Sequence, residues 1–176
     1  MGYTLRIGEA TINWHEESVR IDVDGVKHDD APAFDEPTDY TNARWPSYSS
    51  WSNFCRDMGL TNVMLNERNG GCGELKYGET YLYPLMPEHP GAAPITKAHL
   101  QYVEEKVAAY KAANPDHRAE YPPPRPDARP VVGTLYRDVD LVDDPTCDGN
   151  LCRAEWLLYW MRWAVENCEK PVFVNS

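Results

Sequence analysis

The sequence has no long hydrophobic run, and we expect no secretion signal. Its first ten residues, MGYTLRIGEA, carry neither a basic start nor an extended apolar core. No other segment reaches the roughly 20 consecutive apolar residues that a membrane-spanning helix needs. We therefore expect a cytoplasmic protein that makes no contact with a membrane.

Basic residues are scarce. The 176 residues include 17 lysines and arginines against 28 aspartates and glutamates, which gives a net charge of −11. The densest basic stretch, Arg125 to Arg129, is interrupted by proline and aspartate. A surface of this charge repels phosphate backbones, so we expect no direct binding of nucleic acid. Occupation of a basic protein surface, in the manner of a nucleic-acid mimic, stays open as the alternative.

The motifs of common catalytic and cofactor-binding sites are missing as well. The phosphate-binding patterns GxGxxG and GxxxxGK(S/T), the nucleophile elbow GxSxG and the zinc-binding HExxH do not occur. The five cysteines are an odd number, lack zinc-ligand spacing and indicate reduced thiols. Cys72, flanked by glycines, lies in a loop that favours an exposed thiolate, but no histidine is marked as its base. We therefore expect no cofactor and lean against an enzyme.

Aromatic residues and proline, by contrast, are abundant. Six tryptophans, eleven tyrosines and three phenylalanines supply enough apolar surface for a core, while 15 prolines and 11 glycines indicate long loops. We predict a single domain over residues 1–176. Residues 116–130, which include YPPPRPDARP, are expected to form a proline-rich connection within it that carries no packed element.

Alternating apolar residues predict several strands. Residues 3–7 and 10–14 alternate on either side of Gly8-Glu9 and predict a tight hairpin, and residues 19–23 lead to Asp24-Gly25, a dipeptide typical of a second one. The first quarter of the chain is therefore expected to be an antiparallel meander. Shorter strands are expected at residues 63–65, 81–85 and 131–136, and PVFV at residues 171–174 predicts a terminal strand.

Two segments have the apolar spacing of substantial helices. The first runs from Lys97 to about Ala113 behind Thr96 as N-cap, and the second is LCRAEWLLYWMRWAVENC at residues 151–168. A shorter helix follows the serines at 47–50 and ends at Gly59. We predict the α+β class: a small antiparallel sheet, made of the N-terminal meander and a short C-terminal strand, packed against two main helices and joined by long proline-rich loops.

The last of these helices carries a stripe of tryptophans, Trp156, Trp160 and Trp163, beside a stripe of small and aliphatic residues. A helix that is apolar over most of its surface is either central to the core or half of an interface. We therefore predict these three tryptophans as interface residues of a homo-oligomer, with burial in the core as the alternative.

The stretch DYTNARWPSY, residues 39–48, follows neither a helical nor a strand period. Aromatic rings can stack on a base, an arginine can pair with a phosphate, and an asparagine can bind the edge of a ring. This mixture suits a small ligand such as a nucleotide, and packing in the core and against the next helix is the alternative. The candidate ligand-binding residues are Tyr40, Asn42, Arg44, Tyr48 and Trp45.

Two acidic runs offer oxygen ligands for a divalent cation. The first would support a metal-assisted hydrolase. The second, residues 138–148, fails the EF-hand pattern, because Asp143 stands where a glycine is needed and Gly149 where a glutamate is needed. Solvated loop charge is the alternative for both runs. The weak metal candidates in the first run are His28, Asp29, Asp30, Asp35 and Asp39.

Three stretches, MGYTLRIGEA, EPTDYTNARWPSYSSW and EWLLYWMRWAVENCEKPVFVNS, together resemble a group of small uncharacterised bacteriophage and prophage proteins with no assigned activity. The resemblance spans most of the chain and implies a phage-encoded protein that acts in the host cytoplasm. Such proteins often bind a host protein or a host signalling molecule. We therefore expect a non-catalytic binding protein that sequesters a small, nucleotide-like ligand or inhibits a host protein. A metal-assisted hydrolase and a virion structural or assembly protein are the alternatives.

Overall fold

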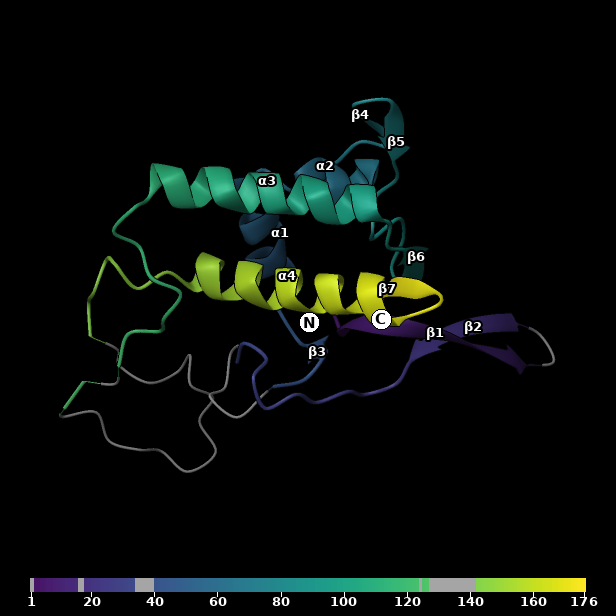
Figure 1. Ribbon diagram of the computed structural model, residues 1–176, viewed down its shortest axis with the longest axis horizontal. Coiled ribbons are helices and arrows are strands. Elements are labelled where there is room, and N and C mark those ends of the chain that lie inside the picture. Colours follow the sequence, from purple (N-terminus) through teal and green to yellow (C-terminus); the bar gives the residue numbers. More distant parts are fainter. Residues whose placement is uncertain (1, 16–17, 34–39, 124, 127–141) are drawn as a thin grey trace.

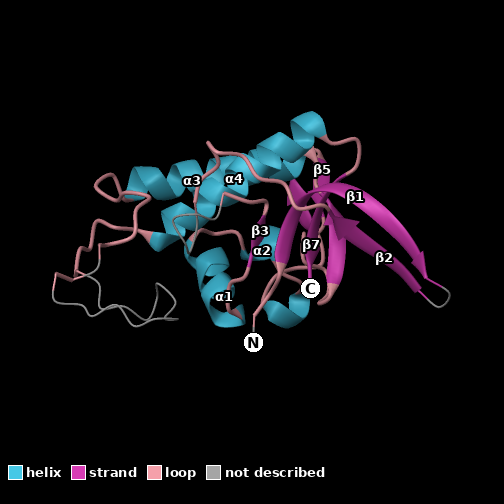
Figure 2. Ribbon diagram, turned by 90° about the horizontal axis from the view of Figure 1, so that it is seen from below, coloured by secondary structure: helices cyan, strands magenta, loops and turns pink. Residues whose placement is uncertain are grey.

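The computed structural model describes residues 2–15, 18–33, 40–123, 125–126 and 142–176, and it has the predicted α+β class. An antiparallel sheet with strand order β2-β1-β7-β6 packs against two long helices, and a further strand, β3, pairs with β1 (Figures 1 and 2). The strands of this sheet are β1 (Leu5–His15), β2 (Ser18–Val23), β3 (Ala43–Arg44), β6 (Gly91–Pro94) and β7 (Pro171–Asn175).

Strand β1 is longer than its sequence pattern predicts. It runs unbroken from Leu5 to His15, so the prediction of a tight hairpin at Gly8-Glu9 is wrong. Its first half pairs with β7 and its second half with β2. Gly8 serves close packing instead of a turn, because a Cβ added there would lie 2.9 Å from Cγ1 of Val23.

The prediction of a hairpin at Asp24-Gly25 is also wrong. After β2 the chain does not fold back on that strand; Lys27 forms an isolated antiparallel bridge with Thr41. The first part of the sheet is therefore the hairpin β1–β2 followed by a connection that returns to β3 beside β1.

Helix α1 (Tyr48–Asp57) forms where its caps predict it. Ser47 accepts a hydrogen bond from the backbone N–H of Ser50, and Gly59 has the positive φ of +69° expected of a stop signal. The strand predicted at residues 63–65 is replaced by a short helix, α2 (Thr61–Met64), because Leu60 accepts a helical hydrogen bond immediately after the turn at Gly59. A 3-10 turn, η1 (Glu67–Asn69), follows.

The two long helices are α3 (Lys97–Ala113) and α4 (Gly149–Asn167). Helix α3 begins at Thr96 with a reciprocal cap: the Thr96 side chain accepts from the His99 N–H, and the Thr96 N–H donates to Nδ1 of His99 at 3.2 Å. Strand β7 follows α4 and confirms the predicted terminal strand. These elements were predictable because their periods and caps are local.

A small separate hairpin consists of β4 (Leu75–Tyr77) and β5 (Thr80–Leu82). Strand β5 overlaps the first part of the strand predicted at residues 81–85. The observed strand is shorter and ends at Leu82, before Pro84. The predicted strand at residues 131–136 lies outside the described residues. In the described part of the connection 116–130 there is no helix or strand, only an isolated bridge of Arg118 with Cys147.

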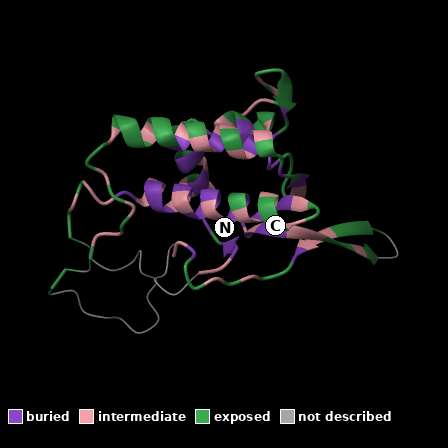
Figure 3. Cartoon of the chain, in the orientation of Figure 1, coloured by how far each residue is buried: buried purple, intermediate pink, exposed green. Residues whose placement is uncertain are grey.

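The core fills the space between the helices and the sheet (Figure 3). Its largest fully buried apolar side chains come from α1, α4 and β7 and include Trp51, Trp156, Trp160, Phe54 and Phe173. None of the helices in the described ranges has the length and apolar character needed to cross a membrane.

Candidate functional site

Asn42, a predicted ligand-binding residue, is fully buried and uses its amide within the protein. Nδ2 donates to the carbonyls of Ile7 and Asp24, both at 2.9 Å, and Oδ1 accepts from the N–H of Val26 at 2.8 Å. One side chain therefore joins β1 to the connection that leaves β2, and its donors and acceptor are turned away from solvent.

Arg44 is also buried, with 1% of its surface exposed. Its guanidinium carbon lies 4.9 Å from the centre of the Trp156 ring, a cation–π distance. Trp156 is fully buried and donates from Nε1 to the carbonyl of Thr41 at 2.9 Å. The cation predicted to bind a ligand thus packs on helix α4.

The three aromatic residues of the predicted set differ in exposure. Tyr40 is half-buried with the Lys27 ammonium 5.9 Å from its ring centre, whereas Trp45 is 57% exposed. The hydroxyl of Tyr48 lies 3.0 Å from Nε2 of His89. Asn42 and Arg44 are therefore buried whereas Trp45 is exposed, and a role in ligand binding stays a prediction for all five residues.

The three tryptophans predicted to form an interface also differ in their exposure. Trp156 and Trp160 are fully buried in the core, and Trp163 is half-buried. Trp163 is therefore the member of the stripe with surface left for a partner to contact, and its use in an interface stays a prediction.

Of the weak metal candidates, His28 and Asp30 are joined through helix α4. The Tyr159 hydroxyl donates to Oδ1 of Asp30 at 3.0 Å, so its oxygen accepts from Nδ1–H of His28, also at 3.0 Å. Asp35 and Asp39 lie outside the described residues. Within the described ranges, no group of three or more histidines, cysteines, aspartates or glutamates is placed to hold a metal ion.

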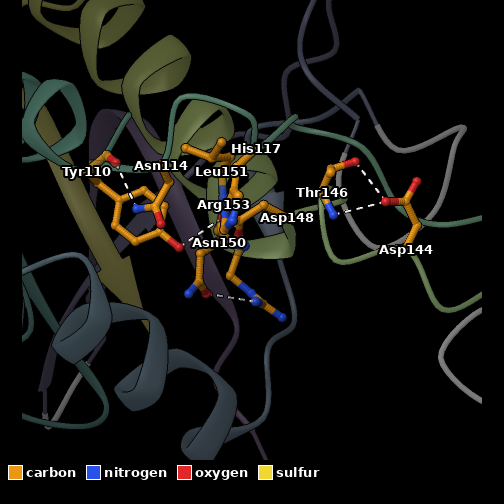
Figure 4. Close-up of polar contacts among 9 residues, drawn as sticks. All are labelled: Tyr110, Asn114, His117, Asp144, Thr146, Asp148, Asn150, Leu151 and Arg153. Carbon is orange, nitrogen blue, oxygen red and sulfur yellow. Dashed lines mark hydrogen bonds and ion pairs between the residues drawn. The ribbon is translucent and has the colours of Figure 1, made fainter. Parts of the chain in front are cut away.

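A polar cluster outside the predicted sites lies at the N-terminus of α4 (Figure 4). Asp148 is at its centre, with 9% of its side chain exposed. Its Oδ1 accepts from the backbone N–H groups of Asn150 and Leu151 at 2.8 and 3.3 Å. Its Oδ2 accepts from the Tyr110 hydroxyl at 2.8 Å and from Nδ1 of His117 at 2.7 Å. One carboxylate therefore joins the end of α3, the connection after it and the start of α4.

These contacts set the charge of the cluster. Burial acts to raise the pKa of Asp148, but the hydrogen bonds from His117, Tyr110 and the two backbone amides outweigh it and hold the pKa below its usual value. Burial, and then the bond to Asp148, raises the pKa of Tyr110. An imidazole whose Nδ1–H is held by a carboxylate presents Nε2 for proton transfer or for a hydrogen bond. The preference of aspartate for N-cap positions was the one signal in the sequence for this cluster.

The hairpin β1–β2 extends away from the helices and from the rest of the sheet (Figures 1 and 2). We call its two strands from Ala10 to His15 and from Ser18 to Val23 the arm. Ile12 lies opposite Ile21 and Trp14 opposite Val19. Because directly opposed side chains share one side of a sheet, these four residues form a single apolar surface, which we call the arm face.

The arm face is open to solvent over most of its length. Trp14 is 78% exposed, Val19 56% and Ile12 44%, and Ile21 is half-buried. At its base Ile21 packs on a small buried cluster that includes Val23. Exposure therefore rises along the arm toward its end (Figure 3).

The reverse side of the arm is polar and its groups bind one another. Asn13 donates from Nδ2 to Oδ2 of Asp22 at 2.7 Å, and Arg20 donates from Nε to Oδ1 of the same carboxylate at 2.8 Å. On the reverse side, therefore, the polar groups already have hydrogen-bond partners. The arm face is a contiguous apolar surface, which is typical of interaction sites.

Comparison with known proteins gave no match: no family model, no curated protein and no solved structure matches this chain.

Proposed function

We propose that this protein is a non-catalytic binding protein that docks on another protein through the arm face. The observation that carries the proposal is the 78% exposure of Trp14, flanked by Ile12 and Val19 on the same side of the hairpin. A buried tryptophan removes about 150–250 Å² from water, and tryptophans are enriched among the residues that dominate binding energies. An open tryptophan on an extended hairpin is therefore suited to anchor a complex.

The charge of the chain favours a basic partner. Residues 9–24 contain five acidic residues and one arginine, and the whole chain has a net charge of −11. A chain of this acidic charge complements a partner surface bordered by lysine and arginine, and attraction between the two speeds association. The resemblance to phage and prophage proteins supports a bacterial host protein as this partner.

The sequence favours either a small, nucleotide-like ligand or a host protein, and we propose the host protein. The amide of Asn42 is engaged with Ile7, Asp24 and Val26 inside the protein, so it is not turned toward a ligand. The arm face, in contrast, has apolar surface in contact with water, which a protein partner would cover.

Site-specific crosslinking tests the proposal. The photoreactive residue p-benzoylphenylalanine is placed at position 19 on the arm face or at position 20 on the reverse side, and each protein is illuminated in a bacterial lysate. We expect a discrete crosslinked protein from position 19 and none from position 20. Equal labelling from the two positions, or none from either, contradicts the proposal.

The crosslinked protein is then purified and its affinity measured by calorimetry. We expect Trp14→Ala to weaken binding by about 30-fold, which corresponds to about 2 kcal/mol for a residue at the centre of an interface. The matched control Arg20→Ala, which changes only the reverse side, should leave the affinity within about threefold. Unchanged binding by Trp14→Ala would show that the arm face is not the docking surface.

A further inference from the structure

The arm has an open edge in addition to its apolar face. Strand β1 pairs with β7 up to Glu9 and with β2 from Ala10 onward. The strand order β2-β1-β7 places these partners on opposite sides of β1. Among the described residues, the last backbone hydrogen bond on the β7 side runs from the Ala10 N–H to the carbonyl of Lys170 at 3.0 Å. In the described part of the chain, no strand lies on this side of β1 beyond that bond.

The alternation of the strand identifies the backbone groups along this edge. The N–H groups of Thr4 and Ala10 bond toward β7, at 2.6 and 3.0 Å, whereas the N–H of Ile7 bonds to the other side at 3.1 Å. The backbone N–H and C=O groups of the even-numbered residues of β1 therefore point toward β7. By the same alternation, Ile12 and Trp14 direct their N–H and C=O groups to the open edge.

The open edge of β1 differs in charge from the outer edge of β2. Between Glu9 and His15, β1 has the sequence ATINW and carries no charged side chain. Strand β2 contains Arg20 and Asp22, and charged residues on an edge strand hinder pairing with another strand. Of the two edges of the arm, the uncharged edge of β1 is therefore the one suited to pairing with an additional strand.

We propose that a second copy of this chain occupies the edge, with the two β1 strands pairing antiparallel about a two-fold axis at Asn13. In this register Ile12 lies opposite Trp14 of the partner subunit, and Asn13 lies opposite Asn13 of the partner subunit. Two N–H and two C=O groups from each copy then form four hydrogen bonds, because residues 12 and 14 are the ones that direct these groups outward. The arrangement is isologous and closed, as in most homodimers.

The side chains fit the same register. A two-fold axis perpendicular to the sheet keeps both arm faces on one side, so Trp14 of each copy packs beside Ile12 of the partner subunit. Aromatic and β-branched residues form favourable pairs when directly opposed. The joined arms make one four-stranded sheet with a continuous apolar side. This inference stands on the edge of the arm and does not depend on what docks on the face.

The dimer is expected to be weak and salt-dependent. Its interface is a short edge, smaller than the roughly 1,200 Å² of stable complexes, so we expect micromolar affinity. Each copy has a net charge of −11, and salt screens the repulsion between them. Added sodium chloride should therefore strengthen this dimer, whereas it would weaken a complex with a basic partner.

Two proline variants test the edge by analytical ultracentrifugation from micromolar to millimolar protein. Ile12→Pro removes an N–H from the proposed interface and leaves the bonds between β1 and β2 in place. Its matched control, Val19→Pro, removes the equivalent outward N–H from the other edge of the arm. With native circular dichroism for both, we expect wild type and Val19→Pro to dimerise and Ile12→Pro to stay monomeric. A wild-type monomer throughout, equal behaviour of the two variants, or a dimer that salt weakens would overturn the proposal.

A disulfide test covers the case in which either proline variant unfolds. Residues directly opposed in a non-hydrogen-bonded pair have Cα atoms about 4.5 Å apart, within the range of a disulfide. Asn13→Cys should therefore give a covalent dimer on mild oxidation. The control is Arg20→Cys, which lies opposite Asn13 on β2 and away from the axis. Covalent dimer from Asn13→Cys above the level of Arg20→Cys and wild type supports the register, and equal amounts contradict it.

Discussion

Trp14 and Val19 lie opposite each other across the β1–β2 ladder, and both are open to solvent. In an antiparallel sheet, alternating apolar residues normally identify the side that packs on a core. Here the same alternation identifies a side that the described part of the chain leaves uncovered beyond Ile21. The pair thus belongs to a surface suited to contact with other molecules.

If the arm face has no internal role, Trp14 should be dispensable for stability. We expect Trp14→Ala to change the free energy of unfolding by no more than about 0.5 kcal/mol, as is usual at exposed sites. Trp160→Ala, which opens a cavity at a fully buried position, should cost about 3–5 kcal/mol. Urea unfolding followed by far-UV circular dichroism compares the two. A similar loss for both would mean that the arm face is covered by the protein itself.

Asp148 should stabilise the fold in a pH-dependent way. Its pKa is lowered in the folded state, so its stabilising effect is present above the unfolded value of about 4 and is lost as pH falls through the folded pKa. We expect Asp148→Asn to cost about 1–3 kcal/mol at pH 7, because a buried charged acceptor is removed from four donors. The difference from wild type should shrink on acidification.

Unfolding free energies measured from pH 7 to pH 2 check this prediction. Asp57→Asn, at an exposed ion pair with Arg56, is the control and should have little effect at any pH. A constant difference between Asp148→Asn and wild type across the whole range would show that the carboxylate charge does not contribute.

His99 should remain neutral below the pH at which an exposed histidine is protonated. Burial lowers its pKa, only partly offset by the hydrogen bond to the Tyr83 carbonyl at 2.9 Å from Nε2. Nδ1 accepts from the Thr96 N–H, so Nε2 carries the proton. Because the folded pKa is depressed, the stability that neutral His99 provides is present above about pH 6.5 and is lost as pH falls through the folded value.

Nitrogen-detected NMR of the imidazole tests this assignment. We expect an unprotonated Nδ1, a protonated Nε2 and a titration midpoint below that of free histidine. A midpoint at or above about 6.5 would contradict the role of burial at this cap.

Gly71 should be the least replaceable glycine of the connection after α2. A Cβ added there would lie 1.8 Å from the carbonyl oxygen of Leu65, and relief of that clash requires backbone movement. We expect Gly71→Ala to cost about 2 kcal/mol or more. Gly25→Ala, where nothing lies within 4 Å of the added carbon, should stay within about 0.5 kcal/mol. Thermal unfolding of the two variants measures the difference, and equal melting temperatures would refute it.

The elements that the sequence predicts well are those with local signals. Helix α3 has the predicted bounds because Thr96 is a cap and the apolar stripe is regular, and Ser47 and Gly59 delimit α1 in the same way. The two false hairpins show the limit of such signals. A glycine between two alternating runs is typical of a turn, but at Gly8 it allows close packing within one strand.

The candidate sites depend on relationships that no local pattern contains. Tyr110 and His117 reach Asp148 across 38 and 31 residues of sequence, so neither pairing leaves a spacing to recognise. The apolar side of the arm is visible in the alternation of Ile12 and Trp14, but whether other parts of the chain cover that side is decided by the tertiary structure. Burial of Asn42 and Arg44 follows from tertiary packing in the same way.

The side-chain amide of Asn42 bonds to backbone N–H and C=O groups of neighbouring segments, as a peptide group of an additional strand would. Its amide bonds to residues 16, 18 and 35 positions away in sequence, and its own backbone bonds to Val26 and Ile7 as well. Movement of Asn42, backbone and side chain, out of its place would release all of these bonds together. In hydrogen–deuterium exchange the amides of Ile7, Val26 and Asn42 should therefore lose protection at a common rate, as one cooperative opening, instead of fraying one after another.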